Sequence, residues 1–246
     1  LIIDKINVSL SNKVIFDSKE QMQYLSENGF DASKFYLINN GSIKGVDTNI
    51  FFKYDFDKKI SLRKKYKIFP NQKVILYMGR MDIDKGILDL LDSFKILSKK
   101  YKNTLLMLVG RDEINLNKYL NKYYSEDIKK IFYLRHNNTP QDIYNLADIF
   151  CLPSKREGFG NVVIEASAVE LPVIGSNIFG LKSSLVNELN GLIFEIGKID
   201  DLTKKLIYLI ENEDVRERLG KNGREYVKNN YNPNDINKSL EKLIFN

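Results

Sequence analysis

Apolar runs alternate regularly with amphipathic stretches along residues 70–212. The runs "KVILYMG" (73–79) and "NTLLMLVG" (103–110) are apolar throughout rather than at every second position. Strands of this kind are buried on both faces, and the helices between them form the crossovers of a parallel sheet. The sequence therefore predicts an α/β fold, a doubly wound parallel sheet with helices on both faces.

The same reasoning extends along the chain. Strands are expected at 12–19, 34–42, 73–79, 103–110, 131–135, 148–154 and 172–176, and the apolar run at 191–196 completes the pattern. Helices are expected at 19–30, 55–68, 86–101, 116–130, 140–147, 161–170, 199–212, 213–229 and 233–245. Ligands of doubly wound sheets bind beyond the carboxyl ends of the strands. This places candidate chemistry in the loops at 79–86, 110–115, 135–140, 154–161 and 176–184.

One of these loops carries two glycines in "REGFGNVVIEA" (156–166). A dinucleotide fingerprint needs a third glycine, a position after the first strand, and an acidic residue about 20 positions later. Here the third position is Val163, the loop follows a late strand, and the next strand ends in "GSN". The dinucleotide interpretation therefore fails.

The loop still has the properties of an anion site. Gly158 and Gly160 let an anion approach the backbone N–H groups near Asn161, where the positive end of a helix dipole lies. Glu157 and Glu165 flank this seat, and carboxylates there accept hydrogen bonds from sugar hydroxyls. For an isolated E-G-x-G, solvated glutamates around a glycine turn are the more common outcome.

A second loop favours the anion site over a simple glycine turn. "YMGRMDIDKG" (77–86) places Arg80 and Lys85 after the first strand of the domain, where two cations hold a diphosphate from the opposite side. Taken alone, both would be ordinary surface charges. Together the two loops indicate a nucleoside diphosphate bonded to a sugar.

Composition excludes several kinds of functional site. Single cysteine and histidine residues, Cys151 and His136, exclude an internal disulfide and a Cys/His zinc cluster, and no G-x-S-x-G turn accompanies the histidine. The net charge of +6 suits an anionic partner.

Nucleic-acid binding through "SLRKKYK" (61–67) and 118–136 is disfavoured, because acidic residues interrupt the cations. We expect a cytoplasmic protein whose membrane contact, if any, is peripheral, since no run is long enough to span a bilayer.

Four stretches closely resemble the donor-binding half of family 4 retaining glycosyltransferases, whose GT-B architecture sets two Rossmann-like domains across a cleft. They are "GRMDIDKG" (79–86), "LPSKREGFGNVVIEASAVELPVIGS" (152–176), "GLKSSLV" (180–186) and "NGLIF" (190–194). "INNGSIKGVDTNIF" (38–51) resembles the segment between the domains in capsule and surface-polysaccharide enzymes. The resemblance runs from about residue 12 to the end of the chain, and the Glu-x7-Glu stretch is its most specific part.

The resemblance implies roles for individual residues. Arg80 and Lys85 would hold the donor diphosphate and, with Glu157, act in catalysis, while Glu165 would bind the ribose. Glu157 and the backbone from Gly158 to Asn161 would face the transferred sugar and its phosphate. Arg135, with His136 and Asn137, matches the region that lines the base, without identifying the base. The full implied donor site consists of Gly79, Arg80, Lys85, Arg135, Glu157, Gly158, Phe159, Gly160, Asn161, Val162 and Glu165.

Three departures from the family pattern are visible. Ser183 stands where relatives often have Asp, and Glu170 stands where a glycine is usual before "LPVI". The third is length, because we expect this sequence to begin at the last strand and helix of the N-terminal acceptor domain. We expect residues 1–52 to be the tail of that domain and the linker, 53–230 a Rossmann-like nucleotide-sugar-binding domain, and 231–246 a C-terminal helix.

The expected function is a retaining, metal-independent transfer of a sugar from a nucleotide sugar, with UDP-sugar as the expected donor, to a saccharide or lipid-linked saccharide in surface-polysaccharide synthesis. Two cations that stabilise the leaving diphosphate would take the place of a metal, so no cofactor is expected. The alternative is a non-catalytic donor-binding fragment or subunit that needs a separate N-terminal domain chain.

Overall fold

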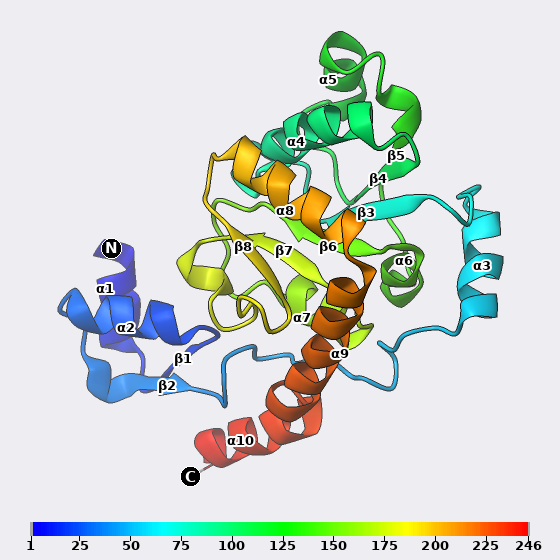
Figure 1. Ribbon diagram of the computed structural model, residues 1–246. Coiled ribbons are helices and arrows are strands. Elements are labelled where there is room, and N and C mark those ends of the chain that lie inside the picture. The colour runs from blue at the N-terminus through cyan, green and yellow to red at the C-terminus, as the bar shows by residue number, and fades with distance from the viewer. Residues whose placement is uncertain (1, 246) are drawn as a thin grey trace.

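A computed structural model describes residues 2–245, with a six-stranded, wholly parallel sheet at its centre (Figure 1). The strand order is β5-β4-β3-β6-β7-β8. The strands are β3 (Lys73–Met78), β4 (Thr104–Val109), β5 (Ile131–Leu134), β6 (Ile149–Leu152), β7 (Val173–Ser176) and β8 (Gly191–Phe194). Each lies inside a segment expected from the sequence, and the doubly wound α/β fold is confirmed.

The order of the strands reverses between β3 and β6. The chain moves outward from β3 to β4 and β5, then returns across the sheet to β6 and continues to β7 and β8. Strands β3 and β6 pair in parallel, with Ile75 opposite Ile149 and Leu76 opposite Phe150. The loops that follow these two strands therefore meet at a topological switch point, where doubly wound sheets bind their ligands.

Helices cover the sheet in two layers. Helix α4 (Ile87–Lys100) packs against α8 (Ile199–Glu211), and α7 (Asn161–Ala168) packs against α9 (Glu213–Asn230) (Figure 1). Helix α3 (Phe56–Lys65) packs on α6 (Pro140–Leu146), and α5 (Leu116–Tyr123) follows β4. The central strands are largely apolar, as expected of strands with both faces covered. Cys151 of β6 is one of these core residues, with no exposed surface.

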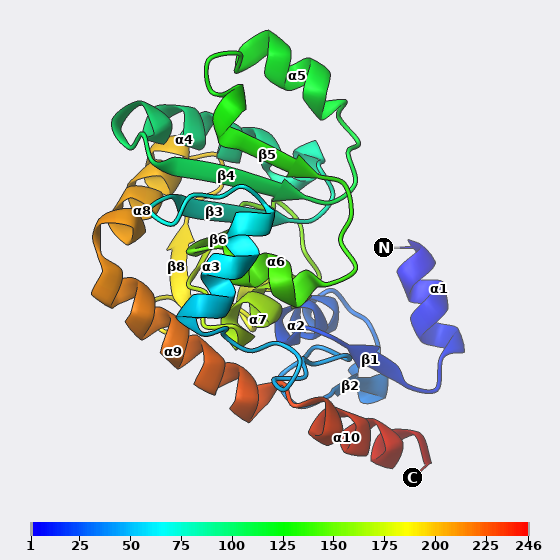
Figure 2. The same ribbon diagram turned by 90° about the vertical axis from the view of Figure 1, so that its right-hand side faces the viewer.

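The N-terminal elements form a smaller unit beside the sheet. Helix α1 (Ile2–Leu10) and α2 (Lys19–Glu27) accompany a two-stranded parallel sheet of β1 (Val14–Phe16) and β2 (Phe35–Leu37). Helix α10 (Pro233–Phe245) lies beside this unit (Figure 2). Lys13 Nζ donates to the carbonyl of Leu243, and Ser239 Oγ donates to Asn39 Oδ1 at 2.9 Å. The domain boundaries stay a prediction.

The expected helix at 116–130 is wrong in length. Helix α5 ends at Tyr123, and a 3-10 turn occupies Ile128–Lys130. Tertiary bonds favour this break, because the buried side chain of Asp127 accepts a bond of 2.6 Å from Ser98 Oγ. Tyr124 OH likewise donates to Asp92 Oδ1 at 2.6 Å. Helix α1 has no counterpart in the expected elements.

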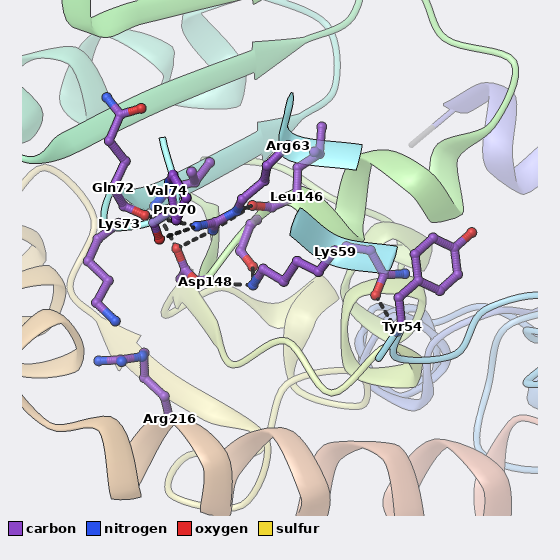
Figure 3. Close-up of polar contacts among 12 residues, drawn as sticks. Tyr54, Lys59, Arg63, Pro70, Gln72, Lys73, Val74, Leu146, Asp148 and Arg216 are labelled. Carbon is purple, nitrogen blue, oxygen red and sulfur yellow. Dashed lines mark hydrogen bonds and ion pairs between the residues drawn. The ribbon is translucent and has the colours of Figure 1, made fainter. Parts of the chain in front are cut away.

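A buried charge cluster fixes the amino-terminal edge of the sheet (Figure 3). Asp148, just before β6, accepts bonds from Arg63 NH2 at 2.7 Å, Lys59 Nζ at 3.0 Å and the Val74 N–H at 2.8 Å. Arg63 also donates to the carbonyls of Leu146, Pro70 and Gln72. These bonds join α3 to the starts of β3 and β6, so the cluster aligns the two strands that meet at the switch point.

Candidate donor site at the switch point

The two loops at the switch point enclose a cavity of about 240 Å³. It is lined by Tyr77, Met78, Gly79, Arg80 and Lys85 from the β3 side and by Leu152, Glu157, Gly160, Asn161 and Val162 from the β6 side. Seven of the eleven residues expected from the sequence therefore reach one cavity. The loops are also bonded to each other, since the Lys155 N–H donates to the carbonyl of Asp84 at 2.8 Å.

Lys85 and Glu157 form the charged centre of this cavity. Lys85 Nζ lies 2.8 Å from Glu157 Oε1 and 3.2 Å from the carbonyl of Arg156. Ser154 Oγ donates to the same Glu157 oxygen at 2.8 Å. Both charged side chains are mostly buried, with 19% and 16% of their surface exposed. Partial burial strengthens their attraction, so each side chain holds the other in place.

Arg80 lies on the open side of the cavity. Its side chain is 54% exposed, and NH1 lies 3.2 Å from Glu113 Oε2 and 3.4 Å from Asp82 Oδ2. Its backbone is held more firmly, because Tyr77 OH donates to the Arg80 carbonyl at 2.6 Å. Burial, with the charge of Glu157 as a second cause, raises the pKa of Tyr77 above its usual value, so this hydroxyl stays a donor.

The start of α7 has the form expected of an anion seat. Gly160 precedes the helix with φ of 77°, a left-handed conformation that favours glycine. Asn161 begins the helix, and its Oδ1 accepts a bond of 2.8 Å from Ser42 Oγ in the linker. The first backbone N–H groups of a helix have no acceptor within the helix, so they can point to a ligand.

Glu165 lies one layer deeper, on α7. Its Oε2 accepts a bond of 2.9 Å from Tyr144 OH, and Lys44 Nζ lies 3.9 Å from Oε1. The side chain is 14% exposed. Burial raises the pKa of Glu165, while the hydrogen bond from Tyr144 and the charge of Lys44 act in the opposite direction. Glu165 does not line the cavity of 240 Å³.

Three other expected residues also lie outside this cavity. The side chain of Phe159 is only 2% exposed and packs edge-on against Tyr231, with ring centroids 5.3 Å apart. Only its backbone is available to a ligand, and the backbone is the part of Phe159 for which a role is expected. Gly158 faces α2, where Gln21 Nε2 donates to its carbonyl at 3.5 Å. Arg135 is exposed after β5, two strands away from β3.

Sequence reasoning missed the residues that hold the charged groups in place. Tyr77, Ser154, Tyr144 and Ser42 each donate a hydroxyl to a predicted site residue. Ser154 and Tyr77 flank the two quoted loops, so proximity in the sequence was a usable signal. Tyr144 and Ser42 lie far from α7 in the chain, and only the folded structure brings them to it.

Glu170 and Ser183, the two residues that depart from the family pattern, each contact another part of the chain. Glu170 adopts a φ of 60°, the left-handed region where glycine is favoured, and Lys53 Nζ lies 3.1 Å from its Oε2. Ser183 Oγ donates to Glu20 Oε2 on α2 at 3.0 Å. Glu170 therefore affects a turn at the opposite end of α7, whereas Ser183 joins the N-terminal unit to the loop after β7.

The close approach of Gly110 to the Gly79 loop gives a stability prediction. Gly110 has a φ of 139°, and a Cβ there would lie 1.9 Å from the Gly79 carbonyl oxygen. Gly110→Ala is expected to lower the free energy of unfolding by about 3 kcal/mol, because the clash adds to the backbone strain. Gly29→Ala is the matched control, since Gly29 has a φ of 78° with no atom within 4 Å. In urea denaturation, we expect Gly29→Ala to lower the free energy of unfolding by about 1 kcal/mol. Equal losses in the two variants would contradict the clash.

Within residues 2–245, no group of three or more His, Cys, Asp or Glu side chains is arranged to hold a metal ion. Nor does any helix in that range combine the length and apolar character that crossing a membrane requires.

The sequence comparisons decide the family. Residues 58–226 match the family described as "Glycosyl transferases group 1". The chain belongs to this family. The matched range contains both cavity-forming loops, and GT-B glycosyltransferases share the observed sheet and helix arrangement.

Individual matches include one capsule enzyme and two solved structures. The chain is 32% identical to the capsular polysaccharide biosynthesis glycosyltransferase CapM of Staphylococcus aureus, over 98% of this chain and 63% of the relative. Anabaena HepE superposes with a TM-score of 0.82 at 19% identity, over 97% of this chain and 67% of that structure. The C-terminal domain of LpcC from Francisella tularensis gives a TM-score of 0.68 at 24% identity, over 75% of this chain and 97% of that domain.

The chain thus spans less than two thirds of CapM. The match to an isolated C-terminal domain agrees with the fold of the six-stranded unit.

Proposed function

We propose that this chain carries the donor site of a retaining glycosyltransferase that takes a sugar from a UDP-sugar and transfers it to a saccharide or lipid-linked saccharide. The observation that supports this most is the cavity at the switch point, where Arg80 and Lys85 face the start of α7. Cationic side chains and backbone N–H groups on opposite walls suit a diphosphate. HepE, which shares the fold, was crystallised in complex with UDP-glucose.

In this proposal the cations act on the leaving group. The bond between the anomeric carbon and the diphosphate oxygen breaks, and the acceptor oxygen forms its bond on the same face of the sugar. The acceptor proton passes to the departing phosphate oxygen. Lys85 and Arg80 stabilise the negative charge that develops on the diphosphate, an electrostatic role that needs no protein nucleophile or metal.

The two glutamates bind the neutral parts of the donor. Glu157 lies beside Lys85 and accepts hydrogen bonds from hydroxyls of the transferred sugar. Lys85 and Ser154 both contact Oε1 of Glu157, which leaves the second carboxylate oxygen to accept a hydrogen bond from the sugar. Glu165, held by Tyr144, accepts hydrogen bonds from the ribose.

A second candidate function is a donor-binding subunit that works only beside a separate N-terminal domain. The small size of the N-terminal unit favours this candidate, because its sheet has only two strands of three residues each. Its helix α1 exposes Ile3, Ile6 and Leu10, a stripe at helical spacing. Turnover by this chain alone would eliminate the subunit hypothesis.

For both candidate functions we propose a cytoplasmic location, with peripheral contact at the inner face of the membrane.

Thermal stabilisation by a panel of nucleotide sugars tests the donor class. A ligand that binds only the folded state raises the melting temperature, and we expect UDP-sugars to do so more than ADP- or GDP-sugars. Arg80→Ala and Glu165→Ala should each weaken UDP-sugar binding about tenfold or more in calorimetry, because each removes a charged hydrogen-bonding group. Variants that bind as tightly as the parent would show that the residue roles are wrong.

A further inference from the structure

A second, larger cavity adjoins the donor cavity and shares Glu157 with it. Its volume is about 930 Å³, and it lies between α2 and the loops that follow β6 and β7. Helix α2 and the 3-10 helix η4 (Phe179–Leu181) are in contact, and both contribute residues to the wall of this cavity. Because Glu157 lines both cavities, a molecule in the larger one lies next to the sugar of a donor in the smaller one.

Three cations reach the larger cavity from the two loops: Lys155, Arg156 and Lys182. Lys155 Nζ lies 3.9 Å from Asp89 Oδ2, so its charge is partly neutralised. Arg156 and Lys182 are exposed, and within the described part of the chain neither forms an ion pair. Lys182 Nζ instead lies over the ring of Phe179, 4.7 Å from its centroid.

All three carboxylates of the cavity, those of Asp4, Glu20 and Glu157, are already engaged within the protein. Glu157 Oε1 accepts bonds from Lys85 and Ser154, both at 2.8 Å. Glu20 Oε2 accepts bonds from Ser18 and Ser183, both at 3.0 Å. Among the described residues, Arg156 and Lys182 therefore lack an ion-pair partner, while the carboxylates of the same wall already have partners, and an anionic ligand suits these two cations.

Aromatic side chains supply the rest of the wall. Tyr24 of α2 is 50% exposed and Phe179 is 63% exposed, and both line the cavity. Binding sites for small molecules combine apolar and aromatic surface with a few well-placed polar groups. An aromatic face can cover the apolar face of a sugar ring while the cations hold its charged group.

We propose that this larger cavity binds the acceptor of the reaction, and that the acceptor is a saccharide with a carboxylate or phosphate group, held by Arg156 and Lys182. This rests on the proposed glycosyl transfer, and it adds the chemical class of the second substrate. The selectivity is electrostatic, so it is greatest at low ionic strength.

The test uses the full chain at low salt with UDP at saturating concentration, so that the donor cavity is occupied. Glucuronate, glucose 6-phosphate and methyl glucoside are titrated separately by ligand-observed NMR. We expect at least one anionic sugar to bind at least fivefold more tightly than methyl glucoside. Binding of glucuronate alone identifies a carboxylate, and binding of glucose 6-phosphate alone identifies a phosphate.

Two double variants make the result specific to the cavity. R156Q/K182Q should weaken binding of the anionic sugar at least fivefold, while K129Q/K204Q, which removes two exposed lysines elsewhere, should change it less than twofold. Equal binding of neutral and anionic sugars, or an unchanged affinity in R156Q/K182Q, would overturn the proposal and leave the donor site standing. A chain that does not bind UDP at all would overturn the proposed function, and this inference with it.

Discussion

Lys85→Ala is expected to weaken UDP binding about 100-fold. Lys85 is one of the two cations that line the donor cavity, and a charge-assisted hydrogen bond to a phosphate contributes about 2–3 kcal/mol. Its removal also leaves Glu157, 2.8 Å away in the parent protein, as an unpaired negative charge beside the diphosphate. Calorimetric titration with UDP at constant ionic strength measures the loss.

A second variant separates the two causes. In the double variant K85A/E157Q the repulsive carboxylate is neutral, so we expect UDP affinity to recover by about threefold to tenfold relative to Lys85→Ala. Lys129→Ala, at an exposed lysine on the far edge of the sheet, is the control for net charge. UDP affinity within threefold of the parent in Lys85→Ala would refute the role of Lys85.

Asp148→Asn is expected to lower the free energy of unfolding by about 3 kcal/mol. The side chain of Asp148 is 15% exposed and is the carboxylate that pairs with both Arg63 and Lys59. Asparagine preserves the shape but leaves two enclosed cations without their counter-ion. Burial already lowers the pKa of Lys59, and Asp148 opposes that effect. Guanidinium denaturation measures the loss, with Glu126→Gln as the exposed carboxylate-to-amide control, expected within 0.5 kcal/mol of the parent.

The effect of Asp148→Asn should depend on pH in one direction. The charges of Lys59 and Arg63 and the hydrogen bonds to Asp148 outweigh its burial and lower the pKa of Asp148 below its usual 3.8. A lowered pKa in the folded state stabilises the protein above the unfolded pKa, and this contribution is lost as the pH falls through the folded pKa. The difference between parent and variant should be constant from pH 5 to 7 and shrink below about pH 4. A difference that grows in acid would contradict this account.

Local sequence pattern was enough to predict the strands of the central sheet and the loops that form the cavity. Local pattern could not predict the order of the strands, because β3 and β6 are separated by 70 residues and become neighbours only through long-range packing. Periodicity reports which residues are apolar, but it does not report which strand lies beside which. The switch point, and with it the meeting of Lys85 and Glu157, therefore came from the structure.

Side-chain directions were the other part that sequence could not supply. Phe159 lies between two glycines of the predicted loop, yet its ring is buried against Tyr231, 72 positions later in the chain. Arg135 follows a strand on the correct side of the sheet, but β5 is an edge strand and lies away from the switch point. The loop of Phe159 and the strand before Arg135 were predictable from local pattern, whereas the burial of the Phe159 ring and the place of β5 at the edge of the sheet depend on tertiary packing.

Cys151 has a practical consequence. It is the single cysteine of the chain, lies in β6 without exposed surface, and burial raises the pKa of its thiol. Thiolate is the reactive form, so maleimide reagents should leave the native protein unlabelled. A cysteine introduced at exposed Asn177, on the rim of the larger cavity, would then take up a fluorophore at that one position and report ligand entry by a change in emission.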